Sequence, residues 1–135
     1  SRYFLSSLYA VYFKTANSED HLLFLLGILN SKLATFVIRK IAYELTKGAF
    51  TKVRTNQLAR LPIPADFARR PQFPRIRAAV REVLQLAEQE IAATLNTEKT
   101  ALQRRIDALE RTIDSEVFAF YGIGPTEASY IDATV

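Results

Sequence analysis

The sequence predicts an α+β fold that is predominantly helical, with a small sheet packed against one long helix, followed by an antiparallel helical hairpin. Residues 8–13 (LYAVYF) are aromatic, aliphatic and β-branched without a breaker, which is typical of a strand buried on both faces. Residues 19–43 place apolar side chains three and four positions apart, which is typical of a helix. Residues 75–121 carry two successive apolar stripes separated by a short break, which indicates two paired helices.

The first strand ends at the polar residues 15–18, where Asn17 or Ser18 can cap the helix that follows. Two acidic residues come next, in the first turn, where the helix macrodipole favours negative charge. We expect this helix to run to about Tyr43 and to pack on the sheet. Its apolar face consists of Leu22, Leu25, Leu26, Leu29, Leu33, Phe36 and Val37.

A glycine turn at Gly48 separates this helix from a second predicted strand at residues 49–54. Thr55 can cap a short turn of helix after that strand. Residues 61–64 (LPIP) then force an extended conformation, because proline fixes its own φ and restricts the residue before it. The proline- and arginine-rich residues 65–74 are predicted to be a linker.

The hairpin is predicted from residue 75 to Tyr121, with the break at Asn96 and Thr97 and a glycine C′ position at Gly122. A short helix should follow from Pro125. This divides the chain into a recognition part at residues 1–64, the linker at 65–74, and a hairpin or coiled-coil spacer with a short last helix at 75–135. The first stripe is Ile76, Val80, Val83 and Ala87, with Leu84, Ile91 and Leu95 beside it, and the second is Leu102, Ile106, Leu109, Ile113 and Phe120, with a missing step at Glu116.

The charge is divided unevenly along the chain. Residues 1–81 hold 14 Lys and Arg against 4 Asp and Glu, whereas residues 82–135 hold 4 against 10. A basic block beside an acidic block favours one part that binds a polyanion and another that faces solvent or a partner. Arg39 and Lys40 belong to the basic block, but they also have a structural interpretation. They lie near the C-terminus of the predicted helix, where the macrodipole favours cations.

The motifs of the common catalytic and metal sites are missing. There is no cysteine and His21 is the only histidine, which argues against thiolate and histidine metal sites and against a Ser-His-Asp triad. Neither a P-loop nor a Gly-x-Gly-x-x-Gly motif is present. The Asn/Asp-Pro-Pro-aromatic motif of amino-methyltransferases is also absent. We therefore expect that this chain alone does not catalyse a reaction.

Residues 22–38 are strongly apolar, but they fall short of the roughly 20 residues that a membrane span needs. Lys32 in the middle of a span would cost about 3 kcal/mol. A buried core helix is therefore predicted, with no membrane contact. The lack of cysteine is compatible with a reducing compartment, so we expect a cytoplasmic location. Because the chain contains no methionine, we also expect it to be a piece of a longer protein.

The order of four short motifs resembles the recognition regions of type I specificity subunits and of type IIG methyltransferase-endonucleases from restriction-modification systems. Residues 26–32 read LGILNSK, residues 48–50 read GAF, residues 58–64 read LARLPIP, and residues 113–123 read IDSEVFAFYGI. The last of these is similar to an ending found in the type IIG group. Residues 65–70 (ADFARR) depart from the pattern usual in type I subunits, which favours the fused type IIG arrangement.

The resemblance implies a sequence-specific DNA recognition module of a DNA adenine-N6 methyltransferase. Its implied partners are double-stranded DNA and a catalytic methyltransferase domain that binds S-adenosylmethionine. Lysines would neutralise phosphates, an arginine suits guanine O6 and N7, and an amide suits adenine. Asn56 and Gln57 have an equally strong structural interpretation as residues of a helix start. The predicted DNA-facing residues are Lys47, Lys52, Arg54, Asn56, Gln57 and Arg60.

A different class of function stays open: a helical assembly or docking module that does not bind DNA. In that case the acidic hairpin would dock on a partner domain or serve as a dimerisation surface. Salt dependence separates the two functions, because binding to DNA weakens steeply with salt and hydrophobic docking does not.

Overall fold

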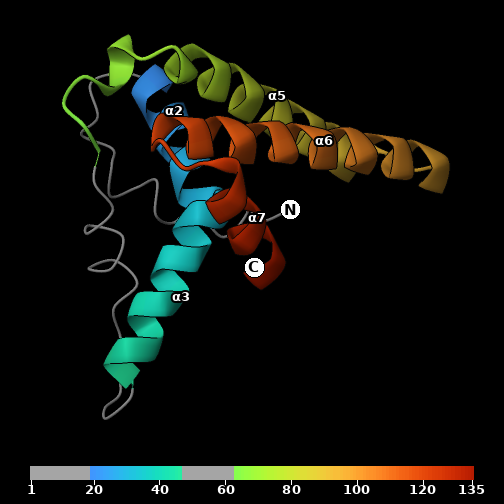
Figure 1. Cartoon of the computed structure of the whole chain (residues 1–135). Coiled ribbons are helices and arrows are strands. Elements are labelled where there is room, and N and C mark those ends of the chain that lie inside the picture. The colour runs from blue at the N-terminus through green and yellow to red at the C-terminus, as the bar shows by residue number, and fades with distance from the viewer. Residues whose placement is uncertain (1–18, 47–62) are drawn as a thin grey trace.

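The computed structural model describes residues 19–46 and 63–135, with side chains for residues 19–40 and 63–135. Figure 1 shows α5 and α6 side by side as a long arm, while α3 leads away from the base of that arm. The elements are α2 (Glu19–Asn30), α3 (Lys32–Thr46), the 3₁₀ helix η2 (Phe67–Arg69), α5 (Gln72–Ala92), α6 (Asn96–Phe120) and α7 (Pro125–Thr134).

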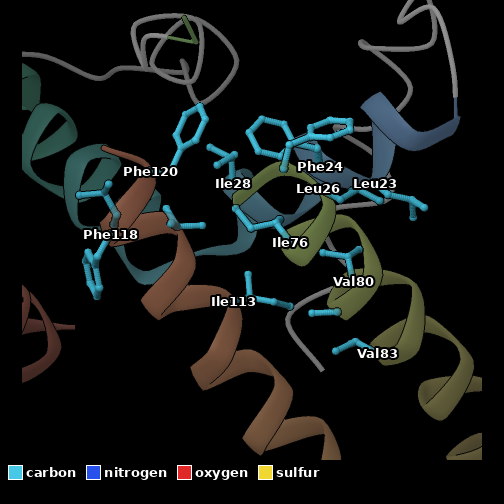
Figure 2. Packing of buried hydrophobic residues seen from close by; sticks show 14 of the residues in the cluster. Leu23, Phe24, Leu26, Ile28, Ile76, Val80, Val83, Ile113, Phe118 and Phe120 are labelled. Atoms are coloured by element: carbon cyan, nitrogen blue, oxygen red, sulfur yellow. The ribbon is translucent and has the colours of Figure 1, made fainter. Parts of the chain in front are cut away.

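The predicted α+β class is wrong, because the part of the chain that the structure describes is all-α and holds no strand. The apolar face of α2 does not cover a sheet. It packs on α5 and α6 instead, so that Phe24 and Ile28 share one core with Ile76 and Ile113 (Figure 2). The apolar side chains of α2, which the sequence analysis expected to contact a sheet, are thus buried by other helices. The two predicted strands, at residues 8–13 and 49–54, lie outside the described residues.

The single helix predicted over residues 19–43 is also wrong, since the structure contains two helices that meet at Ser31. The axes of Glu19–Asn30 and Lys32–Lys40 differ by 57°. No single helix of the described residues is long and apolar enough to cross a membrane, although this bent pair passes that test by length and composition.

Both helices predicted for the hairpin are present, and they enclose most of the core between them. On α5, Ile76, Val80 and Val83 are fully buried, and on α6 the same holds for Ile106 and Ile113. Val117, which is also fully buried, fills the step that the second stripe lacks at Glu116. The buried part of the first stripe is shorter than predicted. Ile91, in the last turn of α5, and Leu95, just after that helix, are 66% and 58% exposed at the far end of the arm.

The C-terminus of α6 has the glycine cap that the sequence predicts. Gly122 has a φ of +68°, a left-handed conformation that favours glycine. The Ile123 N–H donates to the Phe118 carbonyl at 2.8 Å, and the Gly122 N–H donates to the Ala119 carbonyl at 3.1 Å. These two bonds make a Schellman motif, which satisfies carbonyls that the helix end would leave unpaired.

An aromatic cluster joins the N-terminus of α2 to η2 and the start of α5. Phe24 packs against Phe67 and Phe73 with ring centroids 5.3 and 5.2 Å away. His21 contacts the same two rings edge-on at 5.1 and 5.8 Å. Phe67 and Phe73 belong to the segment that the sequence suggested was a linker, so this segment contributes side chains to the shared core.

Candidate nucleic-acid interface

The predicted DNA-facing residues all fall between α3 and η2, outside the described residues. The structure therefore tests the elements on either side of them and not their own positions. On one side the chain arrives through α3, which ends at Thr46. On the other side it continues from Ile63 into η2, where the Phe67 N–H donates to the Pro64 carbonyl at 3.1 Å. The residues in question are Lys47, Lys52, Arg54, Asn56, Gln57 and Arg60.

Arg39 and Lys40 do not have the structural role that their sequence position suggested. Because α3 continues to Thr46, its last turn contains no basic residue, and the macrodipole is not compensated by these two side chains. Both are exposed, and neither forms an ion pair with another residue that the structure describes. Two exposed cations thus lie on the helix that leads into the predicted DNA-facing segment.

These cations border a shallow groove between α3 and α7, which we call the α3–α7 groove. Its volume is about 360 Å³. Tyr130 is 65% exposed there and meets the ring of Phe36 edge-on at 6.1 Å. Cations beside an exposed aromatic ring are suited to a polyanion with planar groups. The lining residues are Phe36, Arg39, Lys40, Tyr130, Thr134 and Val135.

At the C-terminal end of α2, two buried polar side chains donate hydrogen bonds to the helix backbone. The Asn30 side-chain amide donates to the Leu26 carbonyl at 2.8 Å. The Ser31 hydroxyl donates to the Ile28 carbonyl at 2.7 Å. Both polar side chains are therefore satisfied by backbone carbonyls near the end of α2, inside the core, and the Ile28 carbonyl also accepts the Ser31 N–H at 3.2 Å.

The N-terminus of α3 uses two side chains, one of them from a distant part of the chain. The Ala34 N–H donates to the Ser31 hydroxyl oxygen at 3.2 Å, the usual bond of a serine N-cap. The Lys32 N–H donates to the Asp114 carboxylate at 2.9 Å, and Asp114 belongs to α6. We call Asn30, Ser31 and Asp114 the α2–α3 joint. It brings the LGILNSK motif and the first residues of the IDSEVFAFYGI motif into direct contact.

The α2–α3 joint shows what Asn30 and Ser31 do. The sequence suggested a polar stripe that packs a helix on a sheet, and the sheet in that interpretation is wrong. The two residues are 4% and 0% exposed, and they end one helix and start another at a sharp bend. Sequence reasoning missed Asp114, because the residue that it serves lies 82 positions away.

The described residues hold no group of three or more His, Cys, Asp or Glu side chains that could bind a metal ion. The clearest shift of a titratable group lies away from the groove: burial raises the pKa of Tyr121 to about 12, and nearby Arg70 lowers it in part. The Arg70 guanidinium lies 4.8 Å from the Phe120 ring centroid and donates to the Phe120 carbonyl at 2.9 Å. Arg70 is thus part of the structure at the end of α6.

Comparison with known proteins matches residues 1–63 to the family model of the TaqI-like C-terminal specificity domain. No curated protein and no solved structure matches the chain. The matched range contains α2, the bend, α3 and all six predicted DNA-facing residues. Residues 1–63 are thus similar to the TaqI-like C-terminal specificity domain, which confirms the predicted resemblance to a target-recognition region of restriction-modification methyltransferases.

Proposed function

We propose that this chain is the DNA-recognition part of a restriction-modification methyltransferase that modifies adenine N6. The single observation that carries the proposal is the family match, because it covers the segment in which sequence reasoning placed the DNA contacts. The parent protein would carry the catalytic domain and bind S-adenosylmethionine there. It would act on double-stranded DNA in the cytoplasm.

The chemistry of base methylation explains why such a part is needed. An enzyme that acts on a base must extrude it from the duplex, so other residues must hold the flanking DNA in register. In our proposal Lys47 and Lys52 neutralise phosphates, whereas Arg54, Asn56 or Gln57 contacts base edges. Arg60 adds to the positive charge of the same segment.

The exposed cations on α3 extend this surface. Arg39 and Lys40 lie eight and seven residues before Lys47, which corresponds to roughly 11 Å along a helix. That distance would let them contact the backbone beside the bases that residues 47–60 read.

The proposal predicts two classes of effect in the parent enzyme. Lys47→Ala and Lys52→Ala should weaken binding to all DNA sequences about equally, with a salt slope lowered by roughly one unit per lost phosphate contact. Arg54→Ala should instead cost about 1–3 kcal/mol at one base position and relax the preference there. The measurement is equilibrium binding to a panel of single-base variants of the recognition site, at several salt concentrations.

Lys99 offers a matched control, because it is exposed at the start of α6, on the distal end of the arm. Lys99→Ala removes one positive charge and should leave both the salt slope and the sequence preference unchanged. A Lys99→Ala variant that lowers the slope as much as Lys47→Ala would show that net charge, and not a DNA surface around residues 47–60, produces the effect.

One observation favours the alternative function, docking of the hairpin on a partner domain. Ile91 and Leu95 expose apolar side chains at the distal end of the arm, where water contact is unfavourable. Association through these residues would change little with salt, whereas DNA binding through lysine contacts would weaken steeply. The same salt series therefore distinguishes the two functions.

A further inference from the structure

The α2–α3 joint buries more polar groups than a continuous core needs. Asn30, Ser31 and Asp114 are 4%, 0% and 5% exposed, and burying a carboxylate is unfavourable unless it gains hydrogen bonds. An unbroken helix through residues 30–32 would pair its own backbone groups without any of them. The buried groups therefore specify the bend itself.

Asp114 sets the bend from outside the two helices. Its carboxylate accepts the Lys32 N–H, the first donor of α3, and a charged acceptor makes a stronger hydrogen bond than a neutral one. Because Asp114 is held on α6, this bond ties the start of α3 to the hairpin. A second tether joins the same residue to α7, where the Lys32 ammonium is 3.2 Å from the Asp132 carboxylate.

The direction of α3 matters because its far end carries the chain into residues 47–60. The helix from Lys32 to Thr46 is roughly 22 Å long at 1.5 Å per residue. A change of about 10° at the joint would therefore displace its far end by about 4 Å. Binding groups must be held to within roughly 0.5 Å of their productive positions, so such a displacement would misalign residues that read base edges.

We propose that Asp114 is a positioning residue for sequence recognition: by holding the first N–H of α3, it fixes the direction of the helix that leads into residues 47–60. This inference rests on the proposed function. Asp114 itself does not touch DNA. It determines how selectively the parent enzyme reads its site, more than how tightly the enzyme holds DNA of any sequence.

The test compares Asp114→Ala with the conservative Asp114→Asn in the parent enzyme. Asp114→Ala removes the acceptor, and we expect the affinity ratio between the recognition site and its single-base variants to fall at least tenfold. Affinity for unrelated DNA and its salt slope should stay as in the parent. Asp114→Asn keeps an acceptor oxygen at nearly the same place. It should therefore retain most of the affinity ratio that the parent shows between its recognition site and the single-base variants.

A destabilised core provides the matched control. Val83 is fully buried on α5, away from the joint, so Val83→Ala should lower the melting temperature without changing the direction of α3. We expect Val83→Ala to retain the affinity ratio at temperatures where the protein is folded. If Asp114→Ala also retains it, Asp114 is only a structural cap and the proposal is overturned.

A second variant removes the same hydrogen bond from the other partner, in case Asp114→Ala does not fold. Lys32 is the first residue of α3, a position that tolerates proline, and Lys32→Pro deletes the N–H that Asp114 accepts. Lys32→Ala is its control, since it removes the ion pair with Asp132 and keeps the N–H. The proposal requires a lower affinity ratio for Lys32→Pro than for Lys32→Ala, and equal ratios would overturn it.

A distance measurement separates failure of this inference from failure of the proposed function. The chain has no cysteine, so Lys40→Cys and Arg104→Cys, both at exposed positions, allow paired spin labels on α3 and α6. Asp114→Ala should broaden or shift the distance distribution. A shifted distribution with an unchanged affinity ratio overturns the positioning role and leaves the DNA-recognition function intact. The proposed function fails instead if alanine at Lys47, Lys52 and Arg54 leaves DNA binding unchanged.

Discussion

Replacement of Ile106 by aspartate is expected to lower the free energy of unfolding by several kcal/mol, on the order of 3 to 5. Ile106 lies on α6, is fully buried and belongs to the core that α5 and α6 enclose. The substitution removes buried apolar surface and places a carboxylate in its position. Urea or thermal unfolding followed by circular dichroism measures the effect.

Ala108→Asp is the matched control, because Ala108 lies two residues further along the same helix and is exposed. The same carboxylate there should cost well under 1 kcal/mol, mainly through helix propensity. If Ile106→Asp were as stable as Ala108→Asp, the face of α6 that carries Ile106 would be exposed to solvent and the hairpin packing would be wrong.

The second large effect on stability is expected at Gly27, where α2 packs closely against α5. A Cβ atom at this position would lie 2.5 Å from Ile76 Cγ2 and 3.0 Å from Val80 Cγ2. Since Ile76 is fully buried, its methyl group cannot move into solvent. Gly27→Val should therefore overpack the core and cost about 2 to 3 kcal/mol.

A double-mutant cycle tests the close approach at Gly27 directly. Ile76→Ala removes Cγ2 and opens room for the valine, although it is destabilising by itself. The double variant Gly27→Val with Ile76→Ala should lose less free energy of unfolding than the two single variants lose together. The expected difference is roughly 0.5 to 3 kcal/mol. Strict additivity would show that the two side chains do not compete for the same space.

Local sequence patterns predict the hairpin well, because its apolar periodicity is set by two helices that pack on each other. The cap at Gly122 is predicted for the same reason, since only the local backbone conformation is involved. In contrast, nothing local shows that α2 packs on helices and not on a sheet. The apolar face of residues 22–29 is equally compatible with either partner, and strand propensity at residues 8–13 favoured the wrong one.

The bend at Ser31 is unpredictable from local patterns for a related reason. Apolar spacing continues through residues 29–33, so helical periodicity gives no sign of a break. At the break, Asp114 accepts the first N–H of α3, and this contact exists only when α6 is folded against the two helices. Arg39 and Lys40 are visible in the sequence as cations, but only the structure shows that α3 continues past them to Thr46 and that both are exposed.

The most direct test of DNA recognition by this chain is a combined alanine variant of the parent enzyme, with Lys47, Lys52 and Arg54 all replaced. Methylation rate and equilibrium DNA binding are measured on the recognition site across a salt series, with the melting temperature as a check of folding. We expect a folded enzyme that binds its site weakly, methylates it slowly and shows a shallower salt slope. A folded variant that methylates the same site at the same rate, with the same salt dependence, would contradict DNA recognition by this segment.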